Sequence, residues 1–176
     1  TMVIKLFSFI AVMLFSCASC EKELHKLSMV KTPYTGDELR IDGYYYSNPT
    51  TDNNIGIAVF YRDGVCMHLF ERPESQDTTD FVENDILLNN TLMSRLWSTP
   101  SNIGVFQINK TTIEFETWIA GRDITTFSHY GEILNDTTFL LTKWTNNDSG
   151  KSYSEKLTYR FRQFSPKPDS TNNFIK

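Results

Sequence analysis

Short runs of aromatic and β-branched residues recur along most of this chain, and they constrain its fold more than any other feature. Turn-forming residues separate the runs, which is the pattern of strands joined by short connections. The chain has 176 residues, the length of a single domain. We expect eight strands, at residues 39–47, 55–62, 65–71, 103–109, 111–119, 124–134, 137–144 and 154–164.

The strongest local signal is Asp63-Gly64, which lies between two apolar strands. A two-residue type I′ turn there predicts a hairpin that pairs Phe60 with Met67 on one face. Both faces of this hairpin are mostly apolar, so one face is expected to line an interior and the other to be covered.

In the later strands, apolar and polar residues alternate more regularly. A turn at Asn109-Lys110 puts Phe106, Ile113 and Phe115 on one face, and we expect Phe106 and Ile113 in the core. A turn at residues 135–136 groups a second set on one face, namely Phe127, His129, Gly131, Ile133, Leu140 and Trp144. Eight sequential strands predict an up-and-down antiparallel barrel, because closure removes exposed strand edges. A β-sandwich is the alternative.

A helical insertion is expected between the third and fourth strands, at about residues 80–97. Asp80 with Glu83 resembles a capping box, and the apolar residues that follow have helical spacing. Asn89-Asn90 is a point at which the element divides into two shorter helices. We expect the insertion to plug or cover the barrel; the alternative is a lid or a partner-binding helix.

The N-terminal region has the pattern of an export signal. Residues 6–14 are almost wholly apolar, and Lys5 is the only charge before Glu21. Ala18-Ser19 precedes Cys20, which resembles the lipobox of bacterial lipoproteins; Cys17 is the alternative acylation site, and an ordinary secretory signal is the alternative to acylation. We therefore expect a signal peptide at 2–19, lipid attachment at Cys20, a tether at 20–38, a barrel domain at 39–164 and a tail at 165–176.

The first and last expected strands carry a family resemblance. Gly43-Tyr44-Tyr45 resembles the glycine, any residue, aromatic motif of lipocalin-like proteins, and Arg160 or Arg162 could stack over that aromatic as the family's arginine does. With the cysteine motif and the closing YRFRQFSPKPDST, nearly the whole chain resembles small lipocalin-like lipoproteins of the Bacteroides group. That resemblance implies a lipid-anchored protein of the cell envelope, at the outer membrane, and it implies no activity.

Several function classes find little support in the sequence. The net charge is −4 with interspersed signs, so no basic stripe is present to bind nucleic acid. The three histidines lack metal-ligand spacing, and we expect no metal and no cofactor. Cys66 lies in an apolar run, which favours a buried thiol. His68 and His129 could meet across the interior, but we expect ordinary strand histidines and no enzyme.

Two functions remain. The first is the binding of a small apolar ligand inside the barrel, on fold analogy. The expected ligand-binding residues all belong to strands that face the predicted interior: Tyr45, Phe60, Met67, Phe106, Phe115 and Phe127. The alternative is a solid-core envelope interaction or assembly factor that docks a partner protein through its helix or loops.

Overall fold

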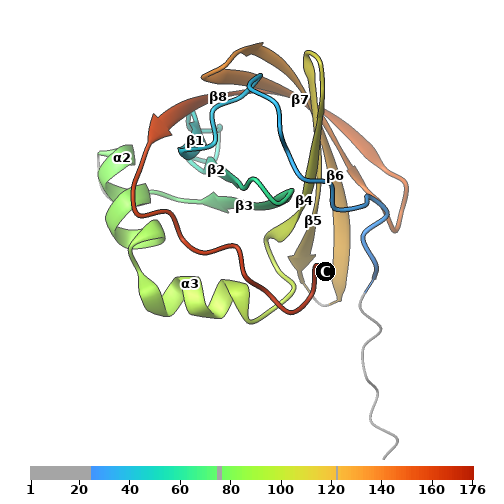
Figure 1. The fold of residues 1–176 in the computed structure, drawn as a ribbon, viewed down its shortest axis with the longest axis horizontal. Helices are drawn as coiled ribbons and strands as arrows, with labels where there is room; N and C mark the ends of the chain where they lie inside the picture. Colours follow the sequence, from blue (N-terminus) through green and yellow to red (C-terminus); the bar gives the residue numbers. More distant parts are fainter. Residues whose placement is uncertain (1–24, 75–76, 122) are drawn as a thin grey trace, which may run out of the picture.

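Eight antiparallel strands form a closed barrel in this computed structural model, which describes residues 25–74, 77–121 and 123–176. The strands follow one another around the ring, and β8 closes it by pairing with β1 (Figure 1). They are β1 (Gly43–Ser47), β2 (Ile55–Phe60), β3 (Val65–Glu71), β4 (Ile103–Asn109), β5 (Thr112–Ala120), β6 (Ile124–Asn135), β7 (Thr138–Asn146) and β8 (Ser152–Gln163). The predicted eight-stranded up-and-down barrel is confirmed.

The turn between β2 and β3 differs from the prediction by one residue. The amide of Gly64 donates to the carbonyl of Tyr61 at 3.0 Å, and Gly64 has φ of +89°. The loop is therefore one residue longer than a type I′ turn, and Phe60 pairs with Cys66. A shift of one residue exchanges the two faces of a strand, so the predicted pairing of Phe60 with Met67 is wrong.

Two later hairpins show one correct and one partly wrong prediction. Phe106 pairs with Phe115 across β4 and β5, as expected from the turn at Asn109-Lys110. Across β6 and β7, Gly131 pairs with Leu141, so Leu140 does not share the inner face. A bulge then shifts the register, and Trp144 pairs with His129.

The barrel has a closed end and an open end. The closed end carries the β2–β3, β4–β5 and β6–β7 turns; the open end carries the β1–β2, β5–β6 and β7–β8 connections. Aromatic rings fill the interior toward the closed end, with Phe60 only 4.9 Å from Phe106 and Tyr45 5.3 Å from Phe139, measured between ring centroids. This half of the interior is a packed core.

The helical insertion covers the outside of the barrel (Figure 1). It consists of α2 (Thr78–Asp80), a π-helical segment η1 (Phe81–Leu87) and α3 (Asn90–Trp97). Their apolar residues pack against the outer face of β1–β3, where Met67 lies. The N-cap is Asp77, three residues earlier than predicted, and Asn89 caps α3, so the expected division at Asn89-Asn90 is confirmed.

The expected tether differs from the structure over its described part, residues 25–38. One carboxylate oxygen of Glu116 on β5 accepts hydrogen bonds from the backbone amides of Ser28 and Met29, at 2.8 and 2.7 Å. Farther along, the buried ring of Tyr34 packs against Phe106. This segment closes one end of the barrel, so it belongs to the domain and not to a free linker. The expected signal peptide, Cys17 and Cys20 lie outside the described residues.

The segment after β8 also packs on the barrel. The ammonium group of Lys167 donates to the carbonyls of Ile41 and Phe60, at 2.7 and 2.6 Å. The chain then runs past α3 (Figure 1), and Phe174 reaches the ring of Trp118 on β5. Both terminal segments therefore cover strands of the wall.

Candidate functional site

Two histidines meet inside the barrel. Strand β3 carries His68 and strand β6 carries His129, and their ring centroids are 4.7 Å apart. Each side chain points inward because of the strand alternation that also places Phe115 and Tyr159 inside. The sequence-based hypothesis that these two histidines meet across the interior is confirmed.

The two histidines differ in their hydrogen bonding. Nε2 of His68 lies 2.8 Å from the hydroxyl of Tyr159, the kind of partner expected for a strand histidine. The ring of His129 stacks on Phe115 with centroids 4.6 Å apart, and within the described residues neither of its nitrogens has a hydrogen-bond partner. An unpartnered buried polar group is costly, so a missing partner is the natural explanation for His129.

Burial keeps both imidazoles neutral. It lowers the pKa of His129 from 6.5 to about 3. It also lowers the pKa of His68 well below that ordinary value, and the nearby His129 adds to the effect. A neutral imidazole has one N–H donor and one acceptor nitrogen, so His129 offers both kinds of hydrogen bond.

A pocket of about 270 Å³ opens beside His129 at the open end of the barrel. This open-end pocket is lined by Phe70, Ile119, Phe127, His129, Trp144 and Glu155. The rings of Phe127 and Trp144 lie 5.7 Å apart, and Tyr153 stacks on Trp144 at 4.1 Å, measured between centroids. The walls are therefore mainly aromatic and the innermost polar group is an imidazole.

Glu155 on β8 is the one carboxylate in this lining. It is half-buried, and desolvation raises the pKa of its carboxyl group. Within the described ranges no Lys or Arg side chain forms an ion pair with it. Within the described residues, the site thus combines a carboxylate that lacks a counter-charge with an imidazole that lacks a hydrogen-bond partner.

The structure distributes the residues predicted for ligand binding over three places. Tyr45, Phe60, Phe106 and Phe115 lie in the packed interior, each no more than 1% exposed. Met67 lies on the outer face beneath the helices. Phe127 alone among the six lines the open-end pocket.

Three lining residues escaped prediction: Phe70, Ile119 and Glu155. Each lies two or four residues nearer the open end, at the same alternation, than an inward residue closer to the barrel centre: His68, Phe115 or Tyr159. Strand parity was the available signal for Ile119 and Glu155, whereas the expected register of β3 put Met67 inside and Phe70 on the opposite face. Parity alone does not say where along the barrel the side-chain packing ends.

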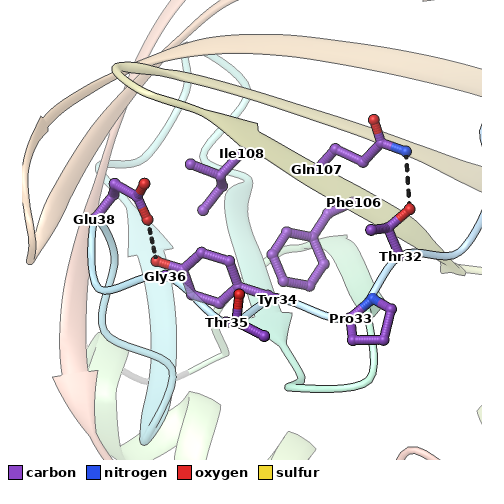
Figure 2. Close-up of a pocket in the computed structure, with 9 residues that line it drawn as sticks. All are labelled: Thr32, Pro33, Tyr34, Thr35, Gly36, Glu38, Phe106, Gln107 and Ile108. Atoms are coloured by element: carbon purple, nitrogen blue, oxygen red, sulfur yellow. Dashed lines mark hydrogen bonds between the residues drawn. The ribbon is translucent and has the colours of Figure 1, made fainter.

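A second hollow lies at the closed end, with a volume of about 310 Å³. Figure 2 shows that the segment before β1 forms one wall of this closed-end groove, with Phe106, Gln107 and Ile108 opposite. The hydroxyl of Tyr34 donates to Glu38 at 3.1 Å and accepts from the amide of Leu39 at 2.9 Å. The Tyr34 hydroxyl is thus paired within the protein, and we interpret this groove as part of the barrel closure.

Comparisons with protein-family models, with curated proteins and with solved structures gave no match to this chain.

Metal, nucleophile and membrane-spanning sites find no support in the described residues. In residues 25–74, 77–121 and 123–176, no three His, Cys, Asp or Glu side chains are grouped as metal ligands would be. Cys66 is buried, and burial raises the pKa of its thiol, so it is poorly suited to act as a nucleophile. No helix in the same ranges has the length and apolar character needed to span a bilayer.

Proposed function

We propose that this protein is a non-catalytic binding protein that holds one small, largely apolar ligand in the open-end pocket of its barrel. The observation that carries the proposal is an aromatic pocket lined by a deeply buried imidazole that has no hydrogen-bond partner in the described part of the chain. Small-molecule sites have this composition: mainly apolar walls with a few polar groups that fix orientation.

The dimensions of the interior limit the ligand. Typical ligand pockets occupy roughly 300–1,000 Å³, and the open-end pocket, at about 270 Å³, lies just below that range. Deeper in the barrel, beneath the pocket, Phe115 and Tyr159 are fully buried and packed against other rings. A long acyl chain would need the space that these rings fill, so a compact ligand is favoured.

Docking of a partner protein through the helices is less well supported. Phe81, Val82, Ile86, Met93 and Leu96 are buried against the barrel, so the apolar face of the insertion is already occupied. Helices that cover a wall in this way contribute to the stability of the fold.

We further propose that the chain is lipid-anchored at Cys20, with Cys17 as the alternative, in the cell envelope and at the outer membrane. His25 lies at the open end, where Nδ1 is 2.9 Å from an oxygen of Asp148 in the β7–β8 connection. Residues 20 and 25 are five positions apart, a reach of ~17 Å at most. An anchor at Cys20 would therefore hold the open end close to the membrane surface.

The anchor is tested by detergent phase partitioning of the protein expressed in a bacterial host. Cys20→Ala is expected to move the protein to the aqueous phase, while Cys17→Ala leaves it with the detergent. The opposite pattern would assign the anchor to Cys17, and partitioning of both variants with the detergent would contradict acylation.

The binding proposal is tested by an NMR titration with 2-phenylethanol, a compact neutral probe. The indole N–H signal of Trp144 is expected to shift in a saturable manner with one site. Ile119→Trp fills the pocket and should weaken binding at least tenfold, whereas Leu134→Trp, an exposed apolar position on β6, is the matched control and should not. Absence of saturable binding both by this probe and by charged probes of the same size would contradict the proposed function.

A further inference from the structure

The carboxylate of Glu155 has an unusual environment. The open-end pocket places it beside the rings of Phe127 and Trp144, and desolvation by these surroundings disfavours its charged form. A half-buried carboxylate normally has a cationic or hydrogen-bonding partner, because removing a charge from water is costly. No such ion pair exists for it within the described residues.

The charge of this lining distinguishes between ligand classes. The six lining side chains include one carboxylate and no Lys or Arg. An anionic ligand would meet repulsion from Glu155, and a neutral one would desolvate the carboxylate further without compensating it. A cation supplies the missing counter-charge, and in a desolvated site such a pair is stronger than in water.

The aromatic walls favour the same class of ligand. An organic cation over the face of a Trp, Tyr or Phe ring is attracted by the ring quadrupole, most strongly by Trp. Trp144, Phe127 and Phe70 offer three rings around a volume that admits only a compact group. These rings would bind the apolar part of the ligand and the carbons next to its charge.

The neutral imidazole of His129 is also compatible with a cationic ligand. Because burial keeps it neutral, His129 does not repel a cation. Both of its ring nitrogens are almost fully covered and have no hydrogen-bond partner among the described residues, so an ammonium N–H that reaches the unprotonated nitrogen would supply one. A lysine or a charged histidine at this position would have the opposite effect.

We propose that the ligand is a compact organic amine, bound with its ammonium group between Glu155 and His129 and its apolar part against Trp144 and Phe127. This inference rests on the proposed function, because it specifies the chemistry of the ligand in the same pocket. It adds that the pocket distinguishes cations from neutral and anionic molecules of equal size.

Three probes of similar shape test the inference on the full chain: 2-phenylethylamine, 2-phenylethanol and phenylacetate. NMR titration at pH 7.5 should give a Kd for the amine at least tenfold lower than for the alcohol, and the weakest binding for the acid. Glu155→Gln should remove the preference for the amine while leaving the alcohol nearly unchanged. Glu132→Gln removes an exposed carboxylate on β6 and is the matched control, which should retain the preference.

The outcomes separate this inference from the proposed function. Equal affinities for amine and alcohol, tighter binding of phenylacetate, or an amine preference that survives in Glu155→Gln would each overturn the amine inference, while saturable binding would still support a ligand pocket. If none of the three probes binds saturably, the proposed function fails and the inference fails with it. The comparison of probes on the unmodified protein gives this answer even if a variant does not fold.

Discussion

The two halves of the barrel interior are built from the same kinds of residue and are packed differently. Toward the closed end, Tyr45, Phe60 and Phe106 are nearly inaccessible, and the hydroxyl of Tyr45 shares its one hydrogen between the carbonyls of Arg40 and Asp136, at 2.9 and 3.0 Å. Toward the open end, Phe127 and Glu155 are only half-buried, and both nitrogens of His129 lack hydrogen-bond partners among the described residues. Complete packing and satisfied polar groups indicate a structural core, whereas incomplete packing around unsatisfied polar groups indicates a site.

The largest effect should come from the closed half. Phe106→Ala is expected to lower the free energy of unfolding by about 3–5 kcal/mol, since a fully buried ring is removed and the closed barrel can collapse little around the cavity. A denaturant melt measures the loss. A loss below about 1 kcal/mol would mean that the closed half is not the packed core described above.

The second effect concerns residues 25–38, which begin at the open end and reach the closed end at Tyr34. Glu116→Gln should lower the free energy of unfolding by about 2 kcal/mol, because the buried carboxylate accepts from the amides of Ser28 and Met29 and from Asn147. Hydrogen exchange at those two amides should also accelerate. Unchanged exchange would show that residues 25–38 are held by other contacts.

The third prediction concerns pH and the open half. The pKa of His129 is lowered on folding, so its contribution to stability is present above pH 6.5 and is lost as the pH falls toward about 3. At pH 5 the loss for this one histidine is roughly 2 kcal/mol. Between pH 8 and pH 5, the free energy of unfolding should therefore fall by about 2 kcal/mol less for His129→Phe than for the unmodified protein. An equal fall in the free energy of unfolding for the two proteins would contradict a neutral His129.

The smallest effect on stability should come from a pocket wall. Phe127→Ala is expected to cost about 1 kcal/mol, because the ring is only partly removed from water. The same change should weaken 2-phenylethanol binding severalfold, whereas Phe106→Ala should leave that affinity almost unchanged. A loss of stability as large as that of Phe106→Ala would remove the distinction between the two halves.

The amino-acid pattern was enough to predict the barrel. It did not predict the length of the β2–β3 loop, where one residue more or less decides which side chains of β3 face inward. Asp63-Gly64 suits a type I′ turn, but a longer loop also places glycine at positive φ, and Gly64 takes that role. The resulting shift moved Met67 to the outer face and paired Cys66 with Phe60. Sequence alone does not distinguish these two loops.

The candidate site was predictable only in part. The meeting of His68 and His129 was proposed as a possibility, and their rings do meet, but the expected register of β3 put Met67 inside and His68 on the opposite face. The depth to which rings fill a barrel depends on how side chains from several strands interdigitate, which no single strand encodes. For the same reason, the polar residues around Ser28 gave no sign that their amides meet Glu116 across a large sequence separation.

The most direct test of the difference between the two halves is to locate a bound probe. Intermolecular nuclear Overhauser effects between 2-phenylethanol and the protein should involve the ring protons of Phe127 and Trp144 and the methyl groups of Ile119, all at the open end. Contacts to Tyr34 and Phe106 instead would place the probe in the closed-end groove and contradict the assignment of the open end as the binding site.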